Sequence, residues 1–186
     1  TWSLVGSEMC IRDRKKGVVI KYPDGQVKEE GIIFNDTKVG RWTEYFDNGK
    51  RKNTGLYIAG KEHGKWYYWY KSGKKEKVGV YQNGIKDGLW RGWYFNGNQF
   101  FERNYKNGEK DGKWTWWFDN NQVKYSGFYK NGIKNDKWIE YDQSGDFKID
   151  GTYKNGNPFN GLFKGEFYFD GEKAEEKINY FSDGGT

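Results

Sequence analysis

Hydrophobic positions along the chain fall in short runs, rich in aromatic and β-branched residues, which are separated by Gly, Asn and Asp. The stretch from Lys113 to Asp136 reads KWTWWFDNNQVKYSGFYKNGIKND and holds two such runs. The first begins at Trp114 and the second ends near Tyr129. Asn-Gly pairs and related turns tolerate the positive φ that tight hairpins need. The pattern therefore predicts one β-hairpin in each stretch of this kind.

The hairpin pattern recurs with a period of 24 residues, which three separate series of residues share. Such a period is typical of repeat proteins. Two of the series are aromatic: Trp42, Trp66, Trp90, Trp114 and Trp138, and Tyr57, Tyr81, Tyr105, Tyr129 and Tyr153. The third series contains the turn glycines Gly60, Gly84, Gly108, Gly132 and Gly156.

The repeats define the organisation of the chain. Full repeats extend over about residues 41–160, and degenerate end repeats cover 15–40 and 161–186, where Val18 and Leu162 take the place of the tryptophan. A lone hairpin is only marginally stable in water, so we expect the repeats to stack edge to edge. The predicted fold is all-β, an elongated antiparallel meander of stacked hairpins in a single array over 15–186.

Composition supports this fold. Aromatic residues make up 20% of the 186 residues, which excludes a disordered chain and favours a core of rings over an aliphatic one. The net charge is +6, from 32 Lys and Arg against 26 Asp and Glu. No apolar run approaches the roughly 18 residues that a membrane-spanning helix needs.

Two aromatic columns follow from the repeat. Residues along a strand alternate faces, so the tryptophan series lies on one face and the residue three positions later on the other. We assign the tryptophan and tyrosine series above to the core. The second column is a candidate exposed ladder for binding: Tyr45, Trp69, Trp93, Trp117 and Tyr141. The alternative is that neighbouring side chains cover this column and that both columns serve folding alone.

Basic residues also recur with the repeat. Lys86, Lys110 and Lys134 occupy the second turn and are candidate binding residues for an acidic protein or anionic lipid headgroups. Alternatively, these lysines only keep the sheet surface soluble. A nucleic-acid partner is not favoured, because the sequence contains no recognised binding module.

Catalytic signals are absent from the sequence. The sole histidine, His63, takes the place that Asp87 and Asp111 have in other repeats, where we expect a turn. The sequence has no metalloprotease motif, phosphate-binding loop or nucleophile elbow. We therefore expect a non-enzymatic protein without a cofactor or metal site.

One repeat shows a characteristic pattern of glycine and aromatic residues: Gly64, Trp66, Trp69, Tyr70 and Gly73, followed by Gly79, Tyr81, Asn83, Gly84, Asp87 and Gly88. This pattern resembles the bacterial variant of the MORN repeat, the kind found in YwqK-type antitoxin proteins. The chain departs from the pattern at Asn121, Arg103 and Asp136, each of which replaces a glycine. The resemblance implies a sheet of hairpins that binds protein or lipid. An antitoxin-like scaffold would act by covering a partner's active surface with its aromatic and basic face.

Two further resemblances bear on the ligand and the termini. GKWYYWYKSGK, from Gly64 to Lys74, resembles choline-binding repeats, so a cell-surface or membrane-associated binder of lipid headgroups, choline or carbohydrate is the alternative. Leu4 to Arg14 resembles a translated sequencing adapter, and we expect residues 1–14 to be non-native. The natural segment then lacks cysteine and its own N-terminus, so the compartment, cytoplasmic or secreted, stays open.

Overall fold

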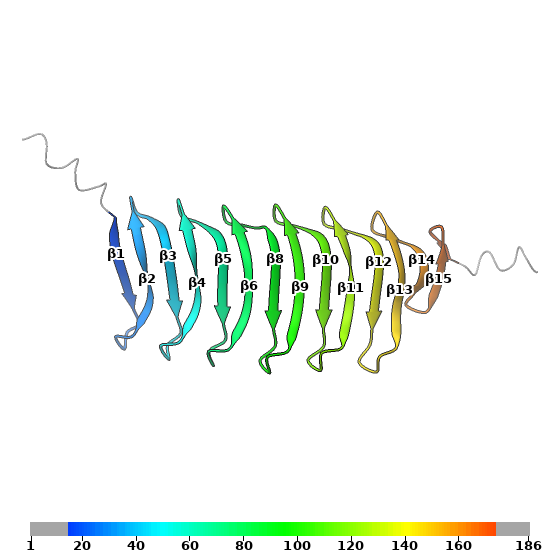
Figure 1. The fold of residues 1–186 in the computed structure, drawn as a ribbon, viewed down its shortest axis with the longest axis horizontal. Coiled ribbons are helices and arrows are strands. Elements are labelled where there is room, and N and C mark those ends of the chain that lie inside the picture. The colour runs from blue at the N-terminus through cyan, green and yellow to red at the C-terminus, as the bar shows by residue number, and fades with distance from the viewer. Residues whose placement is uncertain (1–14, 174–186) are drawn as a thin grey trace, which may run out of the picture. The chain divides into compact units, whose positions relative to one another are not determined.

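The computed structural model describes residues 15–173, and these residues form sixteen antiparallel strands without a helix (Figure 1). The predicted all-β class and the antiparallel meander of hairpins are thereby confirmed. The expected adapter-derived segment, residues 1–14, lies outside the described residues, as do residues 174–186 of the last degenerate repeat. The structure forms two compact units, which divide between Asp87 and Gly88.

The first unit is a meander in which every strand pairs with the next one along the chain. Its strands are β1 (Lys16–Lys21), β2 (Val27–Phe34), β3 (Thr37–Tyr45), β4 (Arg51–Ile58), β5 (Lys61–Trp69), β6 (Lys75–Gln82) and β7 (Ile85–Lys86).

The second unit repeats this arrangement, again with each strand paired to its successor. Its strands are β8 (Gly88–Trp93), β9 (Gln99–Lys106), β10 (Glu109–Trp117), β11 (Val123–Lys130), β12 (Ile133–Tyr141), β13 (Phe147–Lys154), β14 (Asn157–Phe163), β15 (Glu166–Phe169) and β16 (Glu172–Lys173).

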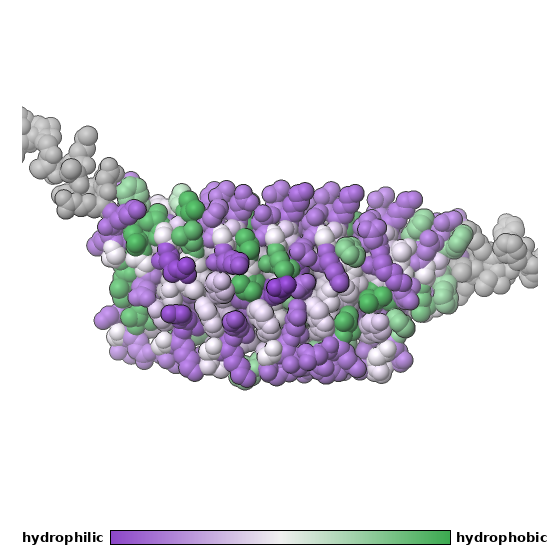
Figure 2. Space-filling view, in the orientation of Figure 1, coloured by the Kyte–Doolittle hydropathy of each residue, from purple (hydrophilic) through white to green (hydrophobic). Residues whose placement is uncertain are grey.

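Two kinds of turn alternate along the chain. One is a two-residue turn such as Asn131-Gly132, with φ of +49° and +77°, which fits the right-handed twist of a hairpin. The other is longer: the Gly49 N–H donates to the Phe46 carbonyl at 3.0 Å, and the Phe46 N–H donates to the Lys50 carbonyl at 2.8 Å. In each unit, hydrophilic residues gather near the turns at the two ends of the strands (Figure 2).

The first strand of each hairpin begins earlier than the sequence suggested. We expected it to begin at the tryptophan, yet β10 begins at Glu109 and holds Trp114 in its interior. The reason is that Asp111-Gly112 does not form a turn. Gly112 has a φ of +84° and lies in a bulge, where the pairing register shifts between Lys110 and Trp114, and the strand continues through it.

Each unit carries its core on one face, which we call the tryptophan face. Trp42, Trp66, Trp90, Trp114 and Trp138 keep only 2–5% of their surface exposed. Tyrosines lie between them with edge-to-face geometry: the Tyr129 centroid is 5.1 Å from both Trp114 and Trp138. Such pairs add to the stability that burial of the rings gives.

Candidate binding surfaces

The ladder column, Tyr45, Trp69, Trp93, Trp117 and Tyr141, is half-buried in every repeat. It lies on the face opposite the tryptophans, which we call the ladder face, because each ladder residue follows its tryptophan by three positions and neighbouring residues of a strand alternate faces. Trp114 pairs with Gly127, for example, whereas Trp117 pairs with Val123 beyond a bulge. The ladder rings therefore remain partly open to solvent, in contrast to the core tryptophans.

Turn tyrosines of the preceding repeat hold the backbone of the ladder column. The Tyr22 hydroxyl donates to the Tyr45 carbonyl at 2.8 Å, and the Tyr94 hydroxyl donates to the Trp117 carbonyl at the same distance. Sequence reasoning missed these residues. The signal was present, since an aromatic residue follows the ladder position at Phe46, Tyr70, Tyr94 and Phe118.

The side chain of Tyr45 is also fixed. Its hydroxyl donates to Glu30 Oε1 at 2.6 Å. This hydrogen bond, together with burial, raises the pKa of Tyr45. The first ladder position is therefore a neutral ring whose orientation is set before any partner arrives.

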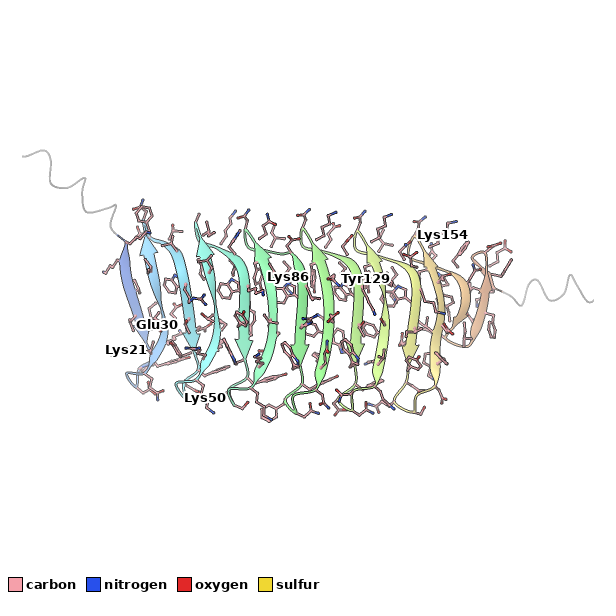
Figure 3. All side chains as sticks on the ribbon, viewed as in Figure 1. Lys21, Glu30, Lys50, Lys86, Tyr129 and Lys154 are labelled. Carbon is pink, nitrogen blue, oxygen red and sulfur yellow. The ribbon has the colours of Figure 1, made fainter. Side chains whose placement is uncertain are left out.

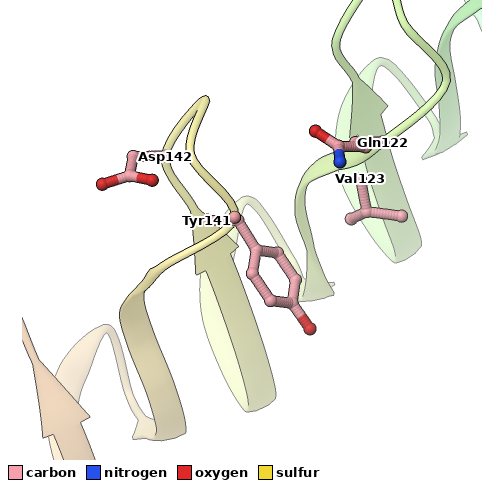
Figure 4. Close-up of a pocket in the computed structure, with 5 residues that line it drawn as sticks. Gln122, Val123, Tyr141 and Asp142 are labelled. Atoms are coloured by element: carbon pink, nitrogen blue, oxygen red, sulfur yellow. The ribbon is translucent and has the colours of Figure 1, made fainter.

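The last ladder residue lines a pocket of about 300 Å³ (Figure 4). The pocket lies between two successive turn regions of the second unit, and its lining residues are Gln122, Val123, Tyr141, Asp142 and Gly145. The Tyr141 ring packs on Phe147 at 4.7 Å. Hydrogen bonds from Ser144 and Lys148 lower the pKa of Asp142, so its carboxylate is charged at the rim.

The candidate lysines do not share the ladder face. Lys110 Nζ lies 4.9 Å from the ring of Trp114, and Lys134 Nζ lies 4.3 Å from the ring of Trp138, so both belong to the tryptophan face. Lys86, labelled in Figure 3, is half-buried in β7 opposite Tyr81. These three lysines therefore do not lie beside the ladder column. These lysines lie in strands rather than turns, on the same face as the core rings.

Lys134 illustrates how such a lysine is accommodated. Its ammonium group lies over the rings of Trp138 and Tyr153, at 4.3 and 4.8 Å. Burial lowers its pKa, since desolvation disfavours the charged form. The attraction between cation and ring offsets part of that desolvation.

The tryptophan face holds further aromatic residues that sequence reasoning missed. Trp116 lies 5.5 Å from Tyr125, and the Arg103 guanidinium lies 4.0 Å from the rings of both Phe101 and Trp116. Burial raises the pKa of Tyr125 to about 12, against an opposing effect of the Arg103 charge. The repeat gave no signal, because the position of Trp116 is Glu44, Tyr68, Gly92 or Glu140 in other repeats.

A cavity of about 220 Å³ opens on the tryptophan face of the first unit, and we call it the acidic cavity. It is lined by Glu29, Lys38, Trp42, Thr43, Glu44, Asn53, Tyr57, Glu62, Trp66 and Tyr68. Two of its three carboxylates have internal partners: Lys38 contacts Glu29 at 2.6 Å, and Lys52 contacts Glu44 at 2.7 Å. Burial acts to raise the pKa of Glu44, but hydrogen bonds from Lys52 and Asn53 outweigh it and lower the pKa.

No metal-binding group of three or more His, Cys, Asp or Glu side chains occurs in the part of the chain that the structure describes. His63, which we expected in a turn, instead lies within β5 and pairs with Leu56. Its Nδ1 atom is buried without a hydrogen-bond partner. Over residues 15–173 there is also no helix that could cross a membrane.

Comparison with family models decides the identity of the repeat. The MORN repeat variant matches residues 38–59, 62–83, 86–107 and 110–131. The chain carries four MORN repeat variants. MORN repeats are generally associated with binding to proteins or membranes. A search of curated proteins finds no match to the chain.

The hairpins of the structure correspond to the MORN repeats. The match to 38–59 covers β3 and β4, and the match to 110–131 covers β10 and β11 up to the tight turn. The hairpin of β12 and β13 lies outside the match but keeps the same aromatic pair, Trp138 and Tyr153. The MORN pattern thus accounts for the core of each hairpin, whereas the acidic cavity depends on residues that vary between repeats.

Proposed function

We propose that this protein is a non-enzymatic scaffold that binds another protein through the ladder column. The supporting observation is the difference between the two aromatic columns. The tryptophan column is 2–5% exposed and serves the core, whereas a second ring in each repeat stays half-buried on the opposite face. Aromatic side chains with part of their surface open are the residues that most often dominate protein interfaces.

The rigidity of the column supports the same proposal. At Tyr45 and Trp117, its backbone is tied to the preceding turn by the hydroxyls of Tyr22 and Tyr94. Binding therefore orders little that is not ordered already, which lowers the entropic cost of association. A partner bound along this face would have its own surface covered, which is the occlusion that the antitoxin resemblance implies.

A lipid or carbohydrate ligand is the alternative, and a protein is favoured for a physical reason. The recurring lysines that would attract anionic headgroups lie over core rings on the other face. Binding to an anionic membrane relies on accessible basic residues near its surface.

The test is selection of peptides from a random display library against the purified full chain. Selected peptides are then titrated against a variant that carries Trp93→Ala and Trp117→Ala. We expect the double variant to fold and to lose about tenfold or more in affinity, as for hot-spot rings. The matched control is Lys110→Ala on the tryptophan face, which should bind as the wild type does.

Two results would contradict the proposal. One is a set of peptides that bind the double variant and the wild type equally well. The other is that no peptide is enriched while anionic vesicles retain the wild-type chain in flotation. The second result would favour the lipid alternative.

A further inference from the structure

A lysine lies over the buried rings in several repeats. Lys38 Nζ lies 4.0 Å from the ring of Trp42 and 5.6 Å from that of Tyr57. Lys110 lies over Trp114 and Tyr129 at 4.9 and 4.7 Å, and Lys134 repeats the arrangement over Trp138. The chain itself therefore shows which chemical group this aromatic surface accepts, an alkylammonium ion held by cation–π attraction.

One repeat lacks this lysine. The position 24 residues after Lys38 is Glu62, so the repeat of Trp66 has a carboxylate where the others have an ammonium group. The Trp66 ring packs against Tyr57, Tyr68 and Tyr81. Within residues 15–173, no lysine or arginine lies over it.

The acidic cavity opens beside this ring. Of its three carboxylates, Glu29 and Glu44 are paired with Lys38 and Lys52, whereas Glu62 has no ion pair within the described part of the chain. Tyr57 and Tyr68 line the same cavity. Burial raises the pKa of both tyrosines, and the nearby charge of Glu62 raises it further.

We propose that the acidic cavity binds an alkylammonium cation, such as a lysine side chain, between Glu62 and the ring of Trp66. The ligand takes the place that the chain's own lysine has in other repeats, and Glu62 supplies the ion pair. Attraction to the ring and to a partly buried carboxylate favours the cation over a neutral group of the same size. The site lies on the tryptophan face and is independent of the ladder column.

The experiment titrates the full chain with n-butylammonium chloride and follows the indole N–H signals in ¹H–¹⁵N spectra, with Trp66 assigned from a Trp66→Phe spectrum. Sodium chloride at equal ionic strength and n-butanol serve as controls. We expect a saturable shift of the Trp66 signal with butylammonium, at an affinity at least about tenfold higher than with butanol.

Two substitutions at Glu62 make the test specific. Glu62→Lys restores the lysine of the other repeats. This variant should fold with a higher melting temperature than the wild type, and its Trp66 signal should show no saturable shift with butylammonium. Glu62→Gln keeps the shape without the charge and should bind about tenfold more weakly. The proposal is overturned if butylammonium shifts Trp66 no more than the controls do. It is also overturned if Glu62→Lys binds butylammonium as the wild type does.

Discussion

At the residue scale, glycines on neighbouring strands make room for the buried tryptophans. A Cβ atom on Gly55 would come within 2.1 Å of the Trp66 ring, and one on Gly127 within 2.1 Å of the Trp138 ring. Such distances are far inside van der Waals contact, so no side chain fits while the ring keeps its place. The mid-strand glycine and the tryptophan of the next strand therefore act as a pair.

Gly127→Ala should destabilise the protein by roughly 1–3 kcal/mol, because the added methyl group forces the buried Trp138 ring to move. The matched control is Gly17→Ala in β1, where a Cβ atom meets nothing within 4 Å. That variant should unfold within about 0.5 kcal/mol of the wild type. Urea unfolding followed by circular dichroism measures both, and equal midpoints for the two variants would refute the pairing.

The surroundings of Arg103 could not be predicted by pairing a mid-strand glycine with the buried ring of the next strand. Arg103 replaces the mid-strand glycine of its repeat, which the sequence revealed only as a departure. In the structure the glycine is on the neighbouring strand, where Gly92 makes room for the buried Phe101 ring. Arg103 then stacks between Phe101 and Trp116. The glycine that makes room for a ring is thus in β8 instead of β9. Predicting this change requires the pairing register of the strands, which composition and period do not give.

At the scale of the hairpin, the tight turns decide the geometry. The first turn residue is asparagine at positions 35, 83, 107, 131 and 155, with φ between +48° and +53°. Ala59 occupies the same position with a φ of +48°. An alanine pays more for this left-handed conformation than an asparagine, whose side chain can bond to the local backbone.

Ala59→Asn should therefore stabilise the protein, by about 0.5–1 kcal/mol. The reverse change in a neighbouring repeat, Asn131→Ala, should destabilise it by a similar amount. Thermal unfolding of the two variants under identical conditions checks both signs. A decrease in stability for Ala59→Asn would show that something other than backbone conformation determines the residue at this turn.

The start of each hairpin was predicted less well than its turns. Asn-Gly signals located the tight turns, because few other pairs accept two positive φ values. Asp111-Gly112 carries the same kind of signal but lies in a strand bulge. Local sequence does not distinguish a bulge from a turn, since both place a residue at positive φ, where glycine is favoured. For this reason the lysines just before the bulge were assigned to turns.

At the scale of the whole chain, the sequence predicted the repeat, the all-β class and the antiparallel meander. These follow from the 24-residue period, which the structure and the MORN match both display. The sequence did not predict the acidic cavity. Its carboxylates Glu29, Glu44 and Glu62 come from three different strands and occupy positions whose residue type changes between repeats. The 24-residue period identifies residues that are the same in every repeat, whereas the acidic cavity depends on residues that differ between repeats.

The central claim is that the two aromatic columns have different roles, and one pair of variants tests it most directly. The free energy of unfolding in urea is measured for Trp114→Ala and Trp117→Ala, which lie in the same strand on opposite faces. Trp114 is 5% exposed, so its removal should cost about 3–5 kcal/mol. Removal of the half-buried Trp117 should cost less than half as much. Equal losses for the two variants would contradict the account, because the ladder column would then be core as well.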